Sequence, residues 1–315
     1  GLWKTKVFIF YTYTFMLKIA LSDLYCHPLP EKHRFPMEKY ELLPRQLVHE
    51  GTVENSNLFV PGDLTDAQIL AVHTPIYFDK LRSLSLTKKE ERRTGFPLSK
   101  RLVEREINIA AGTVECAEYA LSNGVAMNIA GGTHHAYSDR GEGFCLLNDQ
   151  AIASRHLIDT GKCNQVLIID LDVHQGNGTA SIFRDDPSVF TFSMHGERNY
   201  PMHKEQSDLD IGLADDCDDQ FYLSTLEVNL KNIIDSIQPD FVFYQSGVDV
   251  LATDKLGRLG LSMEGCKQRD RMVLETAHEY NIPIVASMGG GYSENINHII
   301  ESHANTFRLA QEIYF

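Results

Sequence analysis

Four short segments of the sequence are rich in His, Asp and Gly, and each follows a run of apolar residues. They are GGTHHA at 131–136, DLDVHQGNG at 170–178, QSGVD at 245–249 and MGGGY at 288–292. In the second segment, Asp170, Asp172 and His174 stand at i, i+2 and i+4, so the two-residue period of a strand predicts that all three point to one side. Buried charges need partners, because an unpaired buried charge is very costly. A metal ion is the partner that this pattern favours.

The residue types in these segments favour zinc. Two carboxylates and an imidazole suit a zinc site with an open fourth position, and Asp249 can supply the ligand that two neighbours on one strand cannot. Taken alone, a D-x-D-x-H pattern is more often a loop network or a helix cap, and adjacent histidines usually form a satisfied polar cluster. Four complementary segments together favour an active site.

The elements that carry these segments alternate between strand and helix patterns. Runs such as VLIID, DFVFYQ and IPIVASM show no polar alternation, which is typical of strands covered on both faces. We predict strands at 17–21, 125–130, 165–170, 188–195, 241–245 and 282–288, and helices at 37–49, 99–123, 148–160, 220–237, 262–280 and 295–313. The predicted fold is α/β, a three-layer sandwich with a mostly parallel central sheet. In such sheets ligands bind beyond the carboxyl ends of the strands, where the four segments lie.

The 315 residues contain no repeat, linker or low-complexity tract that would divide them. We predict one catalytic domain over 16–315, with residues 1–15 as an N-terminal extension before a start at Met16. The apolar stretch at 7–20 is interrupted by Lys18 and is too short to span a bilayer, so no membrane association is predicted.

The charge and the cysteines restrict the partners and the compartment. The chain has 29 Lys and Arg against 43 Asp and Glu, a net charge of -14, which argues against nucleic acid as a partner. The 6 cysteines lie far apart without a C-x-x-C spacing. This favours a reducing compartment, the cytoplasm, and excludes a cysteine zinc site. The sequence predicts no oligomeric state.

Taken together, the motifs resemble the zinc-dependent histone deacetylase superfamily, which has the arginase/deacetylase fold. GGTHHA, GEGFCLLND, IIDLDVHQGNGT, QSGVD and MGGGY occur in the family's order, and the resemblance runs from about His27 to the C-terminus. HPLPEKHRFP at 27–36, NYP at 199–201 and DKLGRLGLS at 254–262 resemble the bacterial and class IV-like branch.

The resemblance implies a role for each motif residue. Tyr292 would be the electrophilic donor, and His134 and His135 would handle the attacking water and its protons. The implied zinc ligands are Asp172, His174 and Asp249.

The resemblance also implies a second cation site and a substrate tunnel. The cation, potassium, would be held by Asp170, the Ser193 hydroxyl and main-chain oxygens that include that of Met194. The main-chain oxygens of Asp172 and His174 would complete that site. The tunnel walls would be Gly143, Phe144 and Tyr200.

Two residues depart from the family pattern. Asn177 stands where some members place an Asp that orients the second imidazole, and Gln175 stands where many place a further His. An Asn can still accept a ring N–H bond, but it offers no negative charge to an imidazolium. We also note Arg34 as a candidate near the cavity floor.

The function predicted from these residues is a zinc amidohydrolase that removes an acetyl or other acyl group from an amine. The partner would be an acylated amine such as acetyl-lysine or an acetylated polyamine. One alternative is a non-catalytic acyl-amine binding or regulatory protein on the same fold, which loss of Tyr292 or of a metal ligand would have indicated. Another is a two-metal ureohydrolase, which would need more bridging aspartates. Tunnel depth would depend on loops at 79–98 and 195–206.

Overall fold

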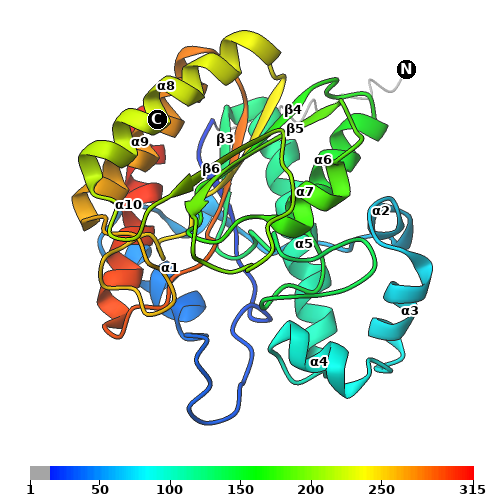
Figure 1. Cartoon of the computed structure of the whole chain (residues 1–315). Coiled ribbons are helices and arrows are strands. Elements are labelled where there is room, and N and C mark those ends of the chain that lie inside the picture. Colours follow the sequence, from blue (N-terminus) through cyan, green and yellow to red (C-terminus); the bar gives the residue numbers. More distant parts are fainter. Residues whose placement is uncertain (1–14) are drawn as a thin grey trace, which may run out of the picture.

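An eight-stranded sheet lies at the centre of the computed structural model, which describes residues 15–315 (Figure 1). The strands are β1 (Lys18–Ala20), β2 (Leu58–Phe59), β3 (Val125–Asn128), β4 (Val166–Asp170), β5 (Val189–Gly196), β6 (Leu209–Leu213), β7 (Phe241–Gln245) and β8 (Ile284–Ser287). Their order in the sheet is β2-β1-β3-β8-β7-β4-β5-β6, and every neighbouring pair is parallel. The carboxyl ends of all the strands therefore meet at one edge of the sheet.

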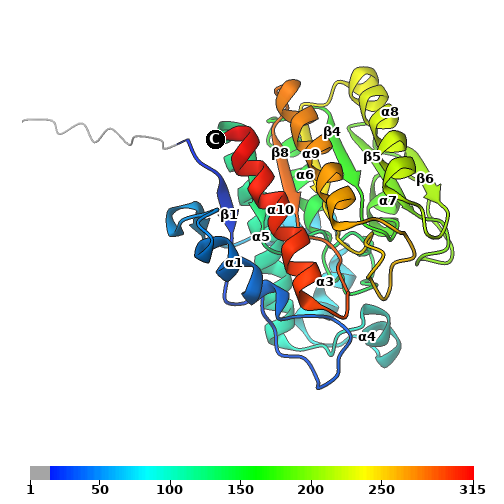
Figure 2. The ribbon, with the colours of Figure 1, turned by 90° about the vertical axis from the view of Figure 1, so that its left-hand side faces the viewer.

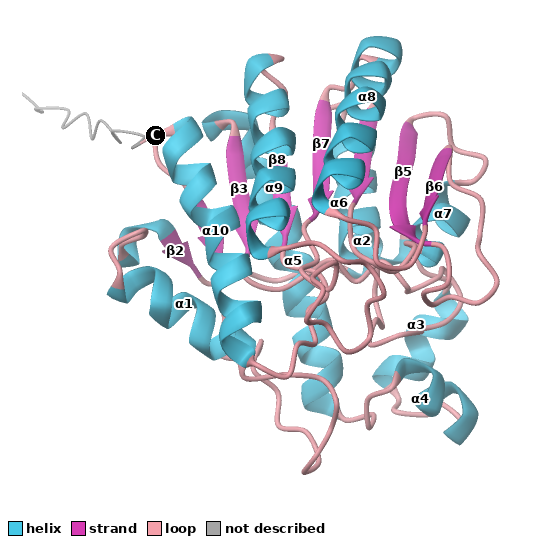
Figure 3. Cartoon of the chain, turned by 60° about the vertical axis from the view of Figure 1, so that its left-hand side comes forward, coloured by secondary structure: helices cyan, strands magenta, loops and turns pink. Residues whose placement is uncertain are grey.

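Helices cover both faces of the sheet. The helices are α1 (Lys39–His49), α2 (Asp66–Leu70), α3 (Pro75–Arg82), α4 (Lys88–Thr94), α5 (Lys100–Asn123), α6 (Asp149–Asp159), α7 (Asn177–Phe183), α8 (Asp219–Ile237), α9 (Met263–Glu279) and α10 (Ile296–Tyr314). Figures 2 and 3 show α1, α10, α9 and α8 side by side over one face, with α5 and α6 behind the sheet. This is the predicted α/β three-layer sandwich.

The buried elements follow the sequence pattern that predicted them. Every residue of β3, β4, β7 and β8 is buried, as expected for strands covered on both faces. Helix α5 begins where the Ser99 side chain accepts a hydrogen bond from the Leu102 N–H, and it ends at Gly124, whose φ of 81° favours glycine.

The predicted strands and helices are confirmed, with bounds that differ by a few residues. Several short elements were not predicted: β2, β6, α2, α3, α4 and α7. The prediction of a loop over 79–98 was wrong, because the end of α3 and all of α4 lie there. Helix α4 (KKEERRT) has no apolar stripe, although its capping box of Thr87 and Glu90 was a readable signal.

The strand argument for Asp170, Asp172 and His174 was also wrong. Strand β4 ends at Asp170, and Asp172 and His174 lie in the turn that follows. The predicted extension lies outside the described residues apart from Phe15, so the division at residue 16 stays a prediction. None of the helices within residues 15–315 is long and apolar enough to cross a membrane.

Candidate metal centre and active site

The four His-, Asp- and Gly-rich segments meet at the carboxyl edge of the sheet. They follow β3, β4, β7 and β8, and these strands are adjacent in the order β3-β8-β7-β4. Residues more than 100 positions apart in sequence are therefore brought together. The Gly290 N–H, for example, donates to Asp172 Oδ2 over 2.8 Å.

Asp172, His174 and Asp249 form a buried group that could hold a metal ion. One ligand atom from each lies within 4.8 Å of the others. His174 Nδ1 is 3.0 Å from Asp172 Oδ1 and 3.1 Å from Asp249 Oδ2. No other group of this kind occurs within residues 15–315.

The chemistry of this group fits a cation. Two carboxylates face one imidazole, and Asp249 Oδ2, although 3.1 Å from His174 Nδ1, is buried without a well-aligned hydrogen bond. Burial, together with the negative charge of Asp172, raises the pKa of Asp249 to about 7. An added positive charge would stabilise this oxygen and reduce the repulsion between the carboxylates.

Glycines allow the neighbouring backbone to approach these carboxylates. A Cβ on Gly290 would lie 2.0 Å from Asp249 Oδ2, and a Cβ on Gly247 would lie 2.3 Å from Asp172 Oδ2. Any side chain at either position would therefore displace a carboxylate of the group. Close packing against the acids thus explains Gly247 of QSGVD and Gly290 of MGGGY.

His134 and His135 lie beside this group with different partners. His134 Nδ1 is 2.7 Å from Asp170 Oδ2, and His135 Nδ1 is 2.6 Å from Asn177 Oδ1. The two rings are 4.0 Å apart between centroids. An Nδ1–H donated to each oxygen leaves both Nε2 atoms free to exchange protons with a substrate or water.

The two imidazoles have pKa values shifted in opposite directions. Burial opposes protonation of His134, but the carboxylates of Asp170 and Asp172 outweigh it and raise its pKa. Burial lowers the pKa of His135 well below its ordinary value, and positive charge on His134 lowers it further. Such a pair separates the roles of a charged and a neutral imidazole.

The Tyr292 side chain is a further polar group near the histidine pair. Burial raises the pKa of Tyr292 well above its ordinary value, so the hydroxyl stays protonated and able to donate. Its backbone N–H donates to Asp254 Oδ2 over 2.6 Å, which holds the turn that follows Gly291.

Two connected spaces adjoin these residues. A small inner cavity of about 40 Å³ is bordered by His134, His135, Gln245 and Arg105. An outer cavity of about 230 Å³ opens to solvent, and its walls include the predicted tunnel residues Gly143, Phe144 and Tyr200. His135, Phe144 and Tyr292 border both spaces.

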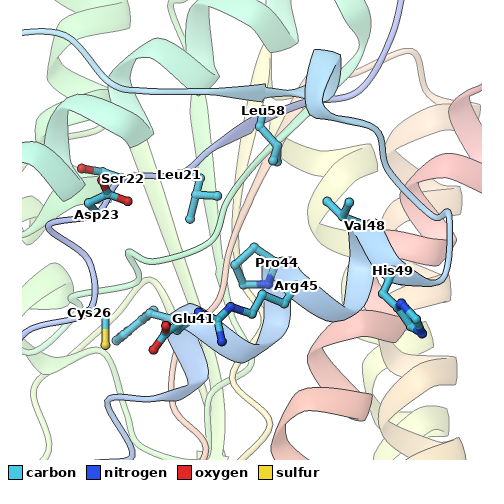
Figure 4. Close-up of a pocket in the computed structure, with 11 residues that line it drawn as sticks. Leu21, Ser22, Asp23, Cys26, Glu41, Pro44, Arg45, Val48, His49 and Leu58 are labelled. Atoms are coloured by element: carbon cyan, nitrogen blue, oxygen red, sulfur yellow. Dashed lines mark hydrogen bonds and ion pairs between the residues drawn. The ribbon is translucent and has the colours of Figure 1, made fainter.

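A larger groove of about 800 Å³ lies elsewhere, between α1, the segment that follows β1, and Leu58 of β2 (Figure 4). It is lined mainly by aliphatic and α1 residues such as Leu21, Pro44 and Val48. None of the predicted site residues lines it, so size alone does not identify the active site.

The comparisons with known proteins agree with this geometry. A model of the histone deacetylase domain matches residues 33–307. The chain belongs to the histone deacetylase family. An uncharacterized protein of the cyanobacterium Picosynechococcus sp. is 43% identical over 290 residues, which cover 92% of this chain and 97% of that protein. Histone deacetylase 2 of Arabidopsis thaliana is 30% identical over 278 residues, covering 85% of this chain and 72% of that protein.

A solved structure shows the same fold. The crystal structure of an HDAC homologue complexed with SAHA has a TM-score of 0.81 at 24% identity, covering 94% of this chain and 84% of that chain. The predicted resemblance to histone deacetylases is confirmed, and its bacterial branch fits the cyanobacterial relative. Membership of the family supports deacetylase activity and implies a metal cofactor.

The predicted site residues of this histone deacetylase family member lie together. The position of Arg34 differs from the prediction. Arg34, proposed near the cavity floor, is exposed and lines the outer cavity instead. The buried arginine at the inner cavity is Arg105, which is 2% exposed and pairs with Glu106.

The predicted potassium site stays a prediction. Asp170 and Ser193 are register neighbours on β4 and β5. However, Asp170 Oδ1 already accepts from the Asp172 N–H at 3.1 Å, and Ser193 Oγ lies 2.8 Å from His195 Nδ1.

Sequence reasoning missed the residues that hold the site in place. Asp149, at the start of α6, accepts hydrogen bonds from the N–H groups of Gly132 and Thr133 and so fixes the turn before the histidines. The buried Lys39 amine donates to the Gly289 oxygen over 3.1 Å. Asp149 could have been found from the sequence, because Asn148 and Asp149 form a helix start signal. Lys39 carries no such signal.

Proposed function

We propose that the chain is a zinc-dependent deacylase that hydrolyses the amide of an acylated amine such as acetyl-lysine or an acetylated polyamine. The observation that carries this proposal is the convergence of three features on one cavity. They are the buried group of Asp172, His174 and Asp249, the histidine pair, and the Tyr292 hydroxyl.

Asp172, His174 and Asp249 would hold the zinc ion. Two carboxylates and one imidazole leave a fourth position open, as in catalytic zinc sites. When bound, the ion would supply positive charge that polarises the amide oxygen and acidifies a water molecule. The remaining steps belong to side chains of this chain.

His135 is the proposed base. It is neutral because burial lowers its pKa, so its Nε2 can accept a proton from the attacking water. His134, whose pKa is raised mainly by Asp170 against the effect of burial, is the proposed acid that protonates the leaving amine. The Tyr292 hydroxyl would donate to the oxygen that becomes negative in the tetrahedral transition state. The products are a carboxylate and a free amine.

The same features weigh against the two alternatives. A two-metal ureohydrolase needs a second set of bridging carboxylates, and one candidate metal group occurs within residues 15–315. A non-catalytic binding protein would have no need of two imidazoles with oppositely shifted pKa values beside the metal group.

The test is hydrolysis by the purified chain after chelation and after reloading with zinc. We expect one zinc per chain, acetate release from an acetyl-lysine substrate only in the loaded protein, and inhibition by SAHA. Two metal ions per chain with urea release would support the ureohydrolase. Tight substrate binding without turnover by the zinc-loaded protein would support the binding protein.

A further inference from the structure

The outer cavity carries positive charge in an otherwise acidic protein. Its nine lining residues include two charged side chains, Arg34 and Arg93, and both are cationic. No carboxylate is among the lining residues, although the whole chain has a net charge of -14. The charge at the mouth is therefore opposite in sign to that of the whole molecule.

Arg34 is available to a ligand. Its guanidinium lies 5.0 Å from the centre of the Phe144 ring, which forms a wall of the cavity. The side chain is exposed, and within residues 15–315 no carboxylate lies close enough to form an ion pair with it. This cation–π contact uses none of the five N–H donors of the guanidinium.

Arg93 is only weakly neutralised. Its Nε is 3.9 Å from Glu142 Oε1, at the outer limit of an ion pair. The same oxygen accepts from Arg140 Nε over 2.9 Å, and Glu142 Oε2 accepts from the Tyr200 hydroxyl over 2.7 Å. Glu142 is thus already occupied, and the Arg93 donors remain open.

The other charged groups near the mouth are paired or satisfied. Asp254 accepts from the backbone N–H groups of Leu256, Gly257 and Tyr292. Lys255 lies 3.4 Å from Glu294. Among these groups, Arg34 and Arg93 are therefore the cations whose N–H donors are open to a ligand.

The sizes of the cavities predict which part of a substrate meets these arginines. The inner cavity, about 40 Å³, is much smaller than the outer cavity, about 230 Å³, so we assign the acyl group to the inner cavity. With the scissile amide beside His135 and Tyr292, the amine part fills the outer cavity and its far end lies at the mouth.

We propose that Arg34 and Arg93 select acylated amines that carry a carboxylate beyond the scissile amide. This inference rests on the proposed function and narrows its substrate class. A guanidinium binds a carboxylate through two parallel N–H bonds, which gives both affinity and orientation. Acetylated polyamines, which bring a second cation to the mouth, are disfavoured. The carboxylate belongs either to a small N-acyl amino acid or to an acidic residue of a peptide.

The experiment compares substrates that differ only in the charge at the far end. The probes are Nα-benzoyl-Nε-acetyl-lysine, its neutral carboxamide, and the cationic N-acetylcadaverine. A pair of amidated acetyl-lysine peptides, flanked by Asp or by Asn, separates the peptide source from the small-molecule source. With the zinc-loaded full chain we expect kcat/KM to be about tenfold or more higher for the acid than for the carboxamide, mainly through KM.

Variants of Arg34 and Arg93 test whether these residues cause the preference for the acid. In Arg34→Gln and Arg93→Gln, kcat/KM for the acid should fall several-fold more than kcat/KM for the carboxamide, so that the preference for the acid is reduced. Arg34→Lys should retain part of the preference. Arg45→Gln on α1, which changes the net charge equally but does not line this cavity, should leave it unchanged. Equal rates for acid and carboxamide, or a preference that survives in the double variant, would overturn the proposal.

A failure of the proposed function gives a different result. If none of the substrates is hydrolysed, the dissociation constants of Nα-benzoyl-lysine and its carboxamide still measure the charge preference of the mouth. Tighter binding of the acid that depends on Arg34 and Arg93 supports the carboxylate site even without turnover. Equal affinities overturn it.

Discussion

Two buried charged clusters lie close together in this protein, and only one of them is electrically balanced. Arg269 and Asp270 on α9 are both 0% exposed and pair over 2.7 Å. Asp270 also accepts from the hydroxyls of Tyr244 and Thr306, and Arg269 donates to the main-chain oxygens of two loop residues. The group of Asp172, His174 and Asp249 instead has two acids for one imidazole, and Asp249 Oδ2 accepts no well-aligned hydrogen bond.

The difference separates a structural cluster from a ligand site. In the first cluster one positive and one negative charge cancel, and the donors of Arg269 are used within the protein. In the second, two carboxylates face one imidazole, and a bound cation would compensate the excess of negative charge. The two are also connected: Arg269 donates to the oxygens of Leu171 and Gly247, which precede Asp172 and Asp249. The pair of Arg269 and Asp270 thus holds the loops that carry Asp172 and Asp249.

The largest expected effect comes from removing a ligand of the unbalanced cluster. Asp249→Ala should abolish tight zinc binding and lower kcat/KM by more than about a thousandfold, beyond the 10- to 100-fold loss typical of groups that only support a ligand. The metal-free variant should also be somewhat less stable than the metal-free parent, because the buried Val173 N–H loses its acceptor Asp249 Oδ1 and His174 loses one of its two carboxylate neighbours. Metal analysis and thermal unfolding with and without zinc measure both effects.

A matched control distinguishes this acid from other buried acids. Asp270→Asn removes a buried carboxylate of the balanced cluster and should leave zinc stoichiometry intact while lowering stability. Unchanged metal content in Asp249→Ala would contradict the ligand assignment.

Breaking the balanced cluster should affect folding first. Arg269→Met leaves Asp270 buried without its cation and two main-chain oxygens without a donor, so we expect a loss of about 3 to 5 kcal/mol in the free energy of unfolding. Denaturant unfolding of the metal-free protein measures it. Combining Arg269→Met with Asp270→Asn should restore part of the loss, and a loss below about 1 kcal/mol would show that the pair is not structural.

Tyr292→Phe should affect catalysis without affecting stability. Within residues 15–315 the Tyr292 hydroxyl makes no hydrogen bond, so its removal leaves no partner unpaired. If it donates to the oxyanion, kcat should fall by about 100- to 1,000-fold while KM and zinc content stay nearly unchanged. Steady-state kinetics with metal analysis tests this, and a near-native kcat would place oxyanion stabilisation on other groups.

Sequence patterns could predict the group of Asp172, His174 and Asp249. They could not predict the buried pair of Arg269 and Asp270. His, Asp and Gly at four strand ends were readable because parallel strands bring their carboxyl ends to one edge. Arg105 and Glu106, and Arg269 and Asp270, are adjacent charged residues within helices, which in sequence are indistinguishable from a solvated face. Their burial depends on which loops pack against the helix, and no local pattern encodes that.

The smallest expected effect is a shift of the pH profile when Asn177, the uncharged residue beside His135, is replaced. Asn177 Oδ1 lies 2.6 Å from His135 Nδ1, and burial holds the pKa of this imidazole well below its ordinary value. Asn177→Asp places a negative charge there, which stabilises the imidazolium and raises the pKa of His135. If His135 must be neutral to accept a proton, kcat/KM is lost as the pH falls through its pKa. The acidic limb of the pH profile should therefore move to higher pH, by about one unit for 1.4 kcal/mol of added stabilisation.

Asp170→Asn provides the opposite perturbation at the other imidazole. It removes the carboxylate that raises the pKa of His134, so the basic limb should move to lower pH if His134 must be charged. Opposite movements of the two limbs, with equal zinc content in all three proteins, would assign His135 as the base and His134 as the acid. An acidic limb that stays in place in Asn177→Asp would contradict this assignment, because the proton would then be accepted by a group that Asn177 does not contact.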